Sequence, residues 1–374
     1  MSLIWLLLSV ASASPVQPPA KAPRTPIRKQ QLQSPGVIFA RINETETLQS
    51  SLGRVLPWSR SSLSDLSAMG AVYYRAPTSR RFVRVGSALL PSNSEQRAQL
   101  QDFVVKEGGE LRVHSEPRRY ATCDELSSET WAKRIQRHAE FLVVDKPAGV
   151  PCVPHVSNGR EWLVPCVAAA IAASRKKRTR EDADIELVPC NRLDVQTSGL
   201  VVLAETKDAA RRFQQLLLDG KVQKRYRALV PGQSFQANQT LEHQISDSVF
   251  GKPVPRLIAP INAATDDSVH KWRDACATIK GATRCDQLQE LEVELHTGRT
   301  HQLRAQLAAI GSPIVDDALY KGLSGFMWRE NSDDQQAAFL VTAADRSDAP
   351  IGLQCSELEF DSEVFHAGEP WWMP

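Results

Sequence analysis

The chain has 374 residues, enough for one large domain or two smaller ones with a substantial core. Its hydrophobic content of 42% and charged content of 24% are ordinary for a globular protein. Five of the 45 Lys and Arg residues lie in the first 43 positions, which contain no acid, so the remaining chain, with all 43 Asp and Glu, is slightly acidic. A global positive field is thereby excluded, and any nucleic-acid binding must come from local patches.

The first residues have the composition of a targeting segment. The apolar run Leu3–Val10 is far shorter than the roughly 20 residues that span a bilayer. A stretch rich in Pro, Ser, Arg and Lys follows, as in organelle transit peptides. We expect residues 1–43 to be a targeting or disordered segment, removed on import into a plastid or mitochondrion, with no membrane contact in the mature form. A secretory signal ahead of a transit segment, and a disordered tail on a protein of the cytoplasm or nucleus, are the alternatives.

The seven cysteines are odd in number and scattered along the chain. They form no C-x-x-C pair and no His/Cys cluster with the spacing of zinc ligands. This pattern predicts reduced, mostly buried thiols and no metal site. It argues against a secreted final destination.

Residues 60–122 predict a small α/β module. A helical repeat of apolar residues ends at Gly70, and strand-like segments follow at 71–74 and 110–114. The helix, "GAVYY" and "GGELRVHSEPRRY" resemble the RNA-binding module named after ribosomal protein S-four. A plain α/β subdomain with solvated arginines is the alternative. The basic residues of this stretch are Arg80, Arg81, Arg84, Arg118 and Arg119.

Residues 135–374 predict a second domain in which strands alternate with a few helices. Its expected strands are residues 140–144, 200–204, 224–230, 291–295 and 355–360, and its expected helices are 161–173, 206–220 and 300–310. The basic run 175–180 is either a solvated loop or an RNA-facing segment. The pattern predicts a mixed α+β fold, with a strand-rich centre and helices packed outside it.

One turn of this domain carries an unusual charge. In NRLDVQTSGL, residues 191–200, the carboxylate of Asp194 comes two residues after Arg192 and just before an apolar strand. A charge on a turn that enters a buried strand is costly unless it is paired or has a function. Asp194 is therefore the first candidate for a catalytic group.

Two further segments supply donors. Lys224 and Tyr226 stand two residues apart on a predicted strand and so share one face of it. Residues 295–304 form a strand end, a glycine turn and a helix start that contain no acid. His301 and Arg304, three residues apart, share one face of that helix start.

Four segments together resemble the RluA-type RNA pseudouridine synthases. They are "FLVVDKPAGVPCVP", "NRLDVQTSGLVVLAETKDAARRFQQLL", "KVQKRYRALV" and "LHTGRTHQLRAQLAAIGSPIVDDALY", in the order and spacing of that family. The likeness covers roughly residues 138–320, and with the leading segment it suggests an organellar member of the plant or algal kind. It implies the pseudouridine synthase fold, a mixed and largely antiparallel central sheet with flanking helices.

The resemblance also implies a role for four residues. Asp194 matches the family's catalytic aspartate, which acts on the glycosidic bond of a uridine that has left the RNA stack. Arg192 matches the arginine that fills the space of the flipped base, and Tyr226 the tyrosine that packs on the uracil. Arg304 matches the basic residue that pairs with the aspartate and keeps it ionised. The reaction requires no cofactor and no metal.

Other donors of these segments are candidates for RNA binding alone. They are Lys224, Arg299 and His301, joined by Arg118 and Arg119 of the preceding module. Each candidate has a plainer interpretation. Lys224 is suited to a phosphate or an acid, and His301 to a hydrogen-bonding role in the turn. The arginines and Tyr226 are compatible with surface, ion-pair or core positions.

The chain departs from the family pattern at two positions. Asn191 stands where the family usually has histidine, so no essential proton transfer depends on that position. Asp316 stands where the family often has glycine before Asp317, which predicts a different local turn. Asp145, Asp316 and Asp317 are rival carboxylates, but none has the flanking arginine of Asp194.

Three hypotheses of function follow. The first is an RNA pseudouridine synthase, an isomerase that acts as a monomer on structured ribosomal or transfer RNA. The second is a non-catalytic RNA-binding or ribosome-assembly factor of the same fold. The third is a glycosidase with a carboxylate nucleophile, which normally needs a second carboxylate about 5 to 10 Å away.

Overall fold

The computed structural model describes residues 36–85, 103–174, 186–232, 235–246, 255–261, 271–321 and 348–373. Most of the predicted targeting segment and the basic run 175–180 lie outside these residues.

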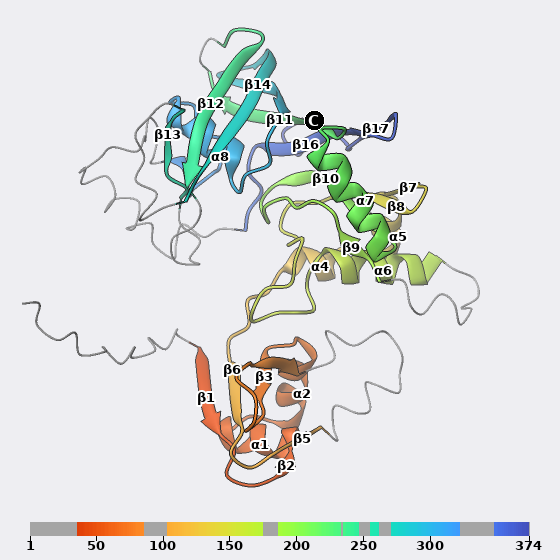
Figure 1. The fold of residues 1–374 in the computed structure, drawn as a ribbon, viewed down its shortest axis with the longest axis vertical. Coiled ribbons are helices and arrows are strands. Elements are labelled where there is room, and N and C mark those ends of the chain that lie inside the picture. Colours follow the sequence, from red (N-terminus) through yellow and green to blue (C-terminus); the bar gives the residue numbers. More distant parts are fainter. Residues whose placement is uncertain are drawn as a thin grey trace, which may run out of the picture. The chain divides into compact units, whose positions relative to one another are not determined.

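The larger part of the fold is an 11-stranded sheet (Figure 1). The strand order is β13-β12-β14-β15-β11-β16-β10-β8-β7, with β17 paired to β16 and β9 paired to β10. Among the described strands of this sheet, β10 and β16 form the one parallel pair. The predicted fold class, mixed with a largely antiparallel sheet, is confirmed. The strands are β7 (Ile135–His138), β8 (Phe141–Lys146), β9 (Val188–Pro189), β10 (Ser198–Ala204), β11 (Gln223–Pro231), β12 (Gln239–Ser246), β13 (Ile258–Pro260), β14 (Trp272–Cys285), β15 (Leu288–Leu295), β16 (Leu353–Phe360) and β17 (Glu363–His366).

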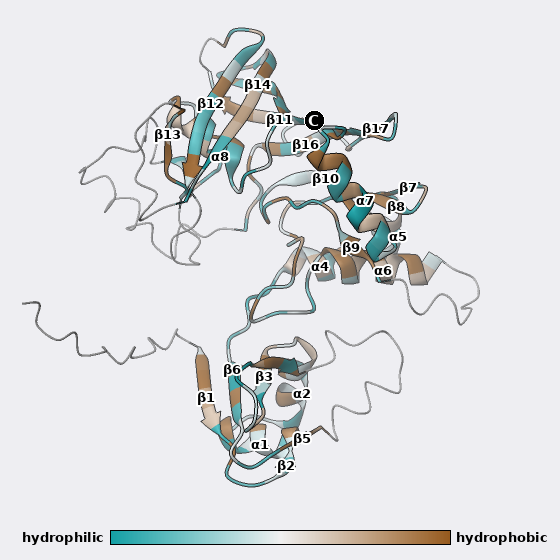
Figure 2. Ribbon diagram, in the orientation of Figure 1, coloured by the Kyte–Doolittle hydropathy of each residue, from teal (hydrophilic) through white to brown (hydrophobic). Residues whose placement is uncertain are grey.

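Helices flank this sheet. The helix α7 (Lys207–Leu218) begins as predicted, with the side chain of Thr206 accepting a hydrogen bond from Ala209 N, and it buries Phe213 against the sheet core. The helix α8 (Gln302–Ala309) packs small residues on β12 and β13. The apolar helix α6 (Leu163–Ser174) is brown and white over most of its length in Figure 2. None of the described helices is long and apolar enough to cross a membrane.

Residues from Gly36 onward also form a separate four-stranded sheet with its own hydrophobic cluster. Its strand order is β1-β6-β3-β4, and α1 and α2 contribute to the same cluster. Residues 37–41, near the end of the predicted targeting segment, form β1 and pair with β6. The elements of this region are β1 (Val37–Arg41), β2 (Glu46–Thr47), α1 (Leu48–Val55), α2 (Arg60–Ala68), β3 (Val72–Arg75), β4 (Val83–Val85), β5 (Val104–Val105) and β6 (Glu110–His114). The short helices α4 (Ala121–Glu125) and α5 (Ser128–Ala132) follow, and their buried residues pack with β8, β10 and α6 of the larger part.

The seven cysteines are all free, and four of them are buried. The prediction of reduced and mostly buried thiols is therefore confirmed. One of the buried thiols, Cys355, lies at the centre of the sheet, where it pairs in register with Gly199 on one side and Tyr226 on the other.

Gly199 permits the parallel contact of β10 with β16. Its φ is +108°, and a Cβ at this position would lie 2.2 Å from the carbonyl oxygen of Cys355. Neither the backbone conformation nor the spacing admits a side chain. Because Gly199 comes five residues after Asp194, this contact also fixes the end of the turn that carries Asp194.

Replacement of Gly199 by alanine tests this constraint. We expect Gly199→Ala to lower the free energy of unfolding by about 3–5 kcal/mol, through a positive φ and a backbone clash together. Gly220→Ala is the matched control, because Gly220 also has a positive φ, +67°, but no atom within 4 Å of the added methyl group. The control should lose only about 1–2 kcal/mol in urea unfolding. Equal losses in the two variants would show that the contact with β16 is unimportant.

Candidate active site

A cavity of about 920 Å³ lies where the turn before β10, the start of β11 and the segment from β15 to α8 meet. Most of the predicted site residues line it, although they come from distant parts of the chain. Those present in the lining are Arg118, Arg192, Asp194, Lys224, Tyr226, Arg299, His301 and Arg304. Arg119 is not part of the lining; it pairs with Glu161 and Asp124 at 2.6 and 3.0 Å.

The guanidinium group of Arg304 is shared between two carboxylates. Its Nη1 donates to Asp194 Oδ2 at 2.9 Å, while Nε and Nη2 donate to the two oxygens of Asp317 at 2.7 and 2.8 Å. The Arg304 side chain is 3% exposed and that of Asp317 is fully buried, whereas that of Asp194 is 24% exposed. The bidentate pair with Asp317 therefore fixes the orientation of Arg304, and Asp194 is the carboxylate that remains open to the cavity.

The surroundings of Asp194 keep its carboxylate ionised. Burial by itself raises the pKa, but the opposing positive groups outweigh it, so the pKa of Asp194 lies below its ordinary value. His301 and Arg304 are the largest of these groups, and Lys146 also contributes. Because burial lowers the pKa of His301 to about 4, its ring is neutral near pH 7. Arg304 and Lys146 thus supply the positive charge at that pH.

His301 is a hydrogen-bonded part of the turn, not a charged group at neutral pH. It is the N-cap of α8 and has a left-handed backbone with a φ of +57°. Tyr320 Oη accepts from Arg256 N at 2.8 Å and lies 3.1 Å from His301 Nδ1, so the phenol donates to that nitrogen. The proton of the neutral ring is then on Nε2, which faces Asp194 Oδ2 at 3.7 Å.

A buried lysine that the sequence analysis did not select supports the Asp194 turn. The ammonium group of Lys146 donates to the carbonyl oxygens of Pro147, Val150 and Val195 at 3.0, 2.9 and 3.4 Å. Burial lowers its pKa to about 8, although nearby Asp194 opposes the change. These bonds connect the turn after β8 to the turn that carries Asp194.

The side chain of Asn191 joins the start of the same turn to β10 by two hydrogen bonds. Its side-chain oxygen accepts from Val202 N at 2.7 Å, and its amide nitrogen donates to Leu200 O at 3.3 Å. Both partners are backbone groups of β10. The side chain thus serves a structural role that needs hydrogen bonds and no titration, in keeping with the departure from histidine at this position.

Tyr226 and Lys224 form one wall of the cavity. Tyr226 is only 7% exposed, and burial, together with its hydrogen bond to the Cys355 side chain, raises the pKa of its phenol well above the ordinary value. Burial lowers the pKa of Lys224, and among the described residues no carboxylate pairs with it. The phenol is therefore neutral and fixed in place, and the lysine is a donor without a carboxylate partner in the described part of the chain.

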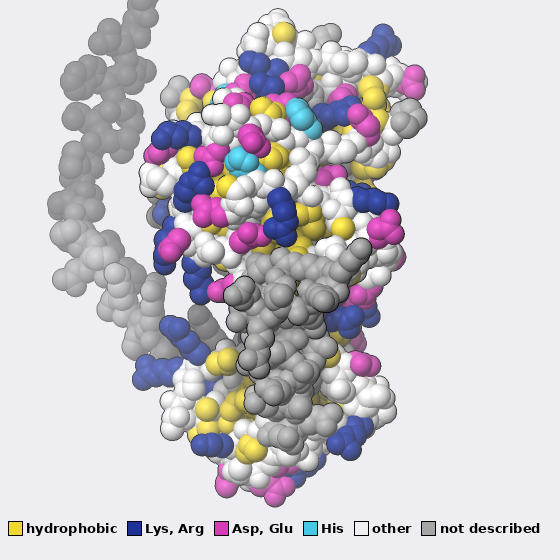
Figure 3. Space-filling model, turned by 90° about the vertical axis from the view of Figure 1, so that its right-hand side faces the viewer, with side chains coloured by type: hydrophobic (Ala, Val, Ile, Leu, Met, Phe, Trp, Pro, Cys, Tyr) yellow, Lys and Arg dark blue, Asp and Glu magenta, His cyan; other side chains and the backbone are white. Residues whose placement is uncertain are grey.

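The remaining predicted basic residues differ in their surroundings. Arg192 is exposed and makes no ion pair within the described part of the chain. Arg118 pairs with Asp348 at 2.5 Å, and Arg299 Nε donates to Asp274 O at 2.9 Å. Over the described part of the face in Figure 3, Lys and Arg side chains are interspersed with Asp and Glu, as expected for a chain without a global positive field.

The rival carboxylates have other partners or positions. Asp145 pairs with Arg134 at 3.0 Å, and burial raises its pKa. Asp316 is exposed with a φ of +62°, a left-handed conformation that glycine adopts most readily and aspartate tolerates. Asp317 holds Arg304, a role that sequence spacing alone did not predict. No group of three or more His, Cys, Asp or Glu residues suited to a metal occurs among the described residues.

Residues 140–309, somewhat less than half of the chain, match the family model described as RNA pseudouridylate synthase. The chain is similar to proteins of this family. It is 26% identical to "RNA pseudouridine synthase 6, chloroplastic" of Oryza sativa subsp. japonica, over 83% of this chain and 74% of the relative. It is also 26% identical to the protein of the same name from Arabidopsis thaliana, over 83% of this chain and 75% of the relative. "Ribosomal large subunit pseudouridine synthase D" of Xanthomonas campestris is 29% identical over 69% of this chain and 76% of the relative. These relatives are named RNA pseudouridine synthases, which are isomerases.

The shared guanidinium group gives a test on stability. Asp317→Asn leaves Arg304 buried beside a single carboxylate, so we expect the free energy of unfolding to fall by about 3–5 kcal/mol. Asp316→Asn is the matched control, because asparagine tolerates a left-handed backbone and the position is exposed. The control should change by less than about 0.5 kcal/mol in urea unfolding. A loss of the same size in both variants would contradict the proposed importance of the pair.

The lowered pKa of His301 gives a test on pH dependence. Between pH 6.5 and about 4 the unfolded chain binds a proton that the folded ring does not, so this residue lowers stability as the pH falls. The loss amounts to up to about 3 kcal/mol. Glutamine does not titrate, so His301→Gln lacks this pH dependence. The free energy of unfolding of the wild type minus that of the variant should therefore decrease from pH 7 to pH 4.5 in urea unfolding. A constant difference across this range would contradict a buried, neutral ring.

Proposed function

We propose that this chain converts specific uridines of structured RNA to pseudouridine, with Asp194 as the catalytic carboxylate. One observation carries the proposal: the carboxylate of Asp194 is ionised, lines the cavity and accepts a hydrogen bond from the buried guanidinium group of Arg304. A carboxylate so placed can attack the anomeric carbon or assist proton loss from the sugar. The N-glycosidic bond between N1 and the sugar breaks, the freed uracil turns within the cavity, and a bond forms between C5 of uracil and the same sugar carbon. C5 then loses its proton and N1 gains one, so the product is an isomer of uridine.

The walls of the cavity support the trapping of a detached base. The fixed ring of Tyr226 offers a flat apolar surface on which uracil packs, and the ring keeps its proton because its pKa is raised. Arg192, exposed at the same cavity, is free to enter the space that the flipped base leaves in the RNA. Lys224 and Arg118 add donors for the RNA at the same cavity.

The glycosidase hypothesis has less support. Such an enzyme normally needs a second carboxylate about 5 to 10 Å from the first to act as acid or base. Asp317 is fully buried and has both oxygens engaged by Arg304. Asp348, the other acid of the cavity lining, pairs with Arg118. Neither carboxylate is available as a second catalytic group.

The names of the relatives suggest where the RNA is found. Two are called chloroplastic and one is named for the large ribosomal subunit. We therefore propose that the protein acts in a plastid, with the mitochondrion as the alternative compartment. Ribosomal RNA is the first substrate to examine, and transfer RNA is the second. Pseudouridine mapping of plastid, mitochondrial and cytosolic RNA, with and without the protein, tests both points.

Asp194→Asn tests the catalytic role. The amide cannot act as a nucleophile or base, so we expect pseudouridine formation to fall below detection while RNA binding persists. Asp316→Asn, a neighbouring aspartate outside the cavity lining, should keep wild-type activity. Both variants are compared by pseudouridine mapping and by circular dichroism. Full activity of Asp194→Asn would overturn the catalytic assignment, and rescue of a deletion strain by this variant would favour the non-catalytic RNA-binding hypothesis.

A further inference from the structure

Lys224 is an unpaired cation in the wall of the active-site cavity. Its side chain is partly buried, and its ammonium group makes no hydrogen bond and no ion pair within the part of the chain that the structure describes. Burial lowers the pKa of this group, because it disfavours the charged form. A buried charge without a partner costs free energy, and such a cost is retained mainly where the charge has a function.

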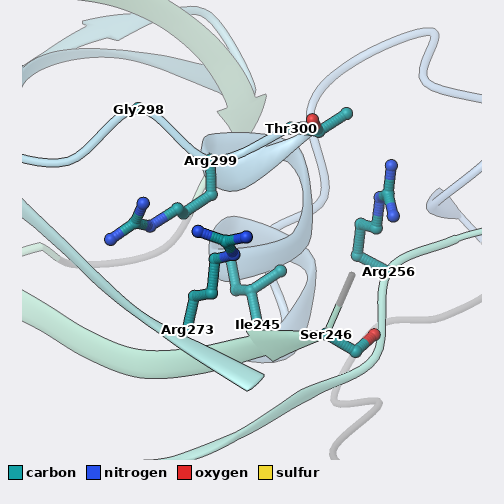
Figure 4. A pocket seen from close by; sticks show the side chains of 7 residues that line it. All are labelled: Ile245, Ser246, Arg256, Arg273, Gly298, Arg299 and Thr300. Atoms are coloured by element: carbon teal, nitrogen blue, oxygen red, sulfur yellow. The ribbon is translucent and has the colours of Figure 1, made fainter. Parts of the chain in front are cut away.

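The position of the ammonium group follows from its neighbours. Tyr226 comes two residues later on β11, and strand side chains that are two residues apart lie on the same face. Burial raises the pKa of the Cys355 thiol to about 11, and both the Tyr226 hydroxyl and the Lys224 ammonium group oppose this change, so both lie near that thiol. A Cβ added at Gly298 would lie 3.6 Å from Lys224 Nζ, so the ammonium group is beside the turn that precedes α8 (Figure 4). The amine therefore lies between this turn and the aromatic wall of the cavity.

A base that packs on the ring of Tyr226 would present its edge to Lys224. Because a strand rises about 3.3 Å per residue, the two side chains leave β11 about 7 Å apart, which is within reach of the long lysine side chain. The carbonyl oxygens of uracil lie at the edge of its ring and accept hydrogen bonds in the ring plane. The phosphates of a flipped nucleotide stay joined to the strand and lie at the mouth of the cavity. A carbonyl oxygen of the base is therefore the acceptor nearest to the amine.

We propose that the Lys224 ammonium group donates to a carbonyl oxygen of the flipped uracil and stabilises the anion that this base becomes when it leaves the sugar. The inference rests on the proposed function, which supplies the uridine. When the bond between N1 and the sugar breaks, its electron pair goes to the uracil ring, and the negative charge spreads over N1 and the two carbonyl oxygens. When C5 joins the sugar, the ring supplies the electron pair and loses this charge. The ammonium group keeps its proton throughout, so it acts on the charge and not by proton transfer.

Barbituric acid is a direct probe of the anion, because it has the ring and the carbonyl groups of uracil but is ionised at neutral pH. Its affinity is compared with that of uracil by NMR titration, in proteins that all carry Asp194→Asn, so that the carboxylate does not repel the anion. We expect the parent to bind barbiturate more tightly than uracil, and Lys224→Gln to reduce this preference about tenfold through the loss of one charged hydrogen bond. Lys224→Arg retains the charge and should retain most of the preference.

Lys221→Gln is the matched control, because Lys221 is an exposed lysine just ahead of β11, outside the cavity lining and paired with Asp219. It should bind both compounds as the parent does. Urea unfolding separates the proposed role from a structural one. Removal of an unpaired buried charge should leave the free energy of unfolding of Lys224→Gln unchanged or raise it, whereas loss of a structural contact would lower it.

Kinetics give a second test. With an active Asp194 and an RNA that pseudouridine mapping identifies as a substrate, we expect Lys224→Gln to lower kcat about a hundredfold with little change in KM. Lys224→Arg should recover most of the rate. A contact of Lys224 with a phosphate would give the opposite pattern, a raised KM for RNA with little change in kcat, and this result would overturn the proposal.

The outcomes separate the role of Lys224 from the proposed function. An unchanged barbiturate preference and kcat in Lys224→Gln, with pseudouridine formed by the wild type, would overturn this role and leave the proposed function intact. A preference that depends on Lys224, with no pseudouridine formed in any RNA, would support binding of the pyrimidine anion and overturn the proposed function. An equal loss of preference in Lys221→Gln would show a general charge effect and would overturn the role of Lys224.

Discussion

The division of one guanidinium group between two carboxylates is the interaction on which the site depends. Asp317 takes two of the three nitrogens of Arg304 and leaves Nη1 with one direction, toward Asp194. A partly buried carboxylate would otherwise tend to take up a proton, because burial raises its pKa. The buried pair thus favours the ionised form of Asp194 and fixes the position of its Oδ2, while the side chain of Asp194 stays partly exposed to the cavity.

The sheet brings the partners of this site together through its centre. Cys355 of β16 lies between Gly199 and Tyr226, so the strand that follows the Asp194 turn and the strand that carries the aromatic ring are held at a fixed spacing. The absence of a side chain at Gly199 makes the close parallel contact possible. Lys146 holds the turn from the opposite side through backbone carbonyl groups. The turn that carries Asp194 is an irregular segment, but the neighbouring strands and Lys146 hold both of its ends.

Local patterns in the sequence were sufficient to predict the positions of the candidate residues that lie within short motifs. The placing of Asp194 in its turn, of Lys224 beside Tyr226 and of the α8 helix start all follow from spacing over a few residues. The role of Asp317 does not, because its partner is thirteen positions away and the pairing depends on how α8 packs. The order of the strands is likewise a long-range property: β10 and β16 are neighbours although more than a hundred residues separate them. Periodicity predicts that strands exist but not which strands pair.

The charge of the chain explains why the RNA contacts must be local. The part after residue 43 is slightly acidic, and the buried centre of the site holds two carboxylates against one guanidinium group. Lys146 adds a second positive charge near Asp194, so the centre has little net charge and does not by itself attract an RNA backbone. We propose that basic side chains of the cavity lining, Arg192 among them, attract the phosphates, while Asp194 stays open to the sugar of the flipped nucleotide.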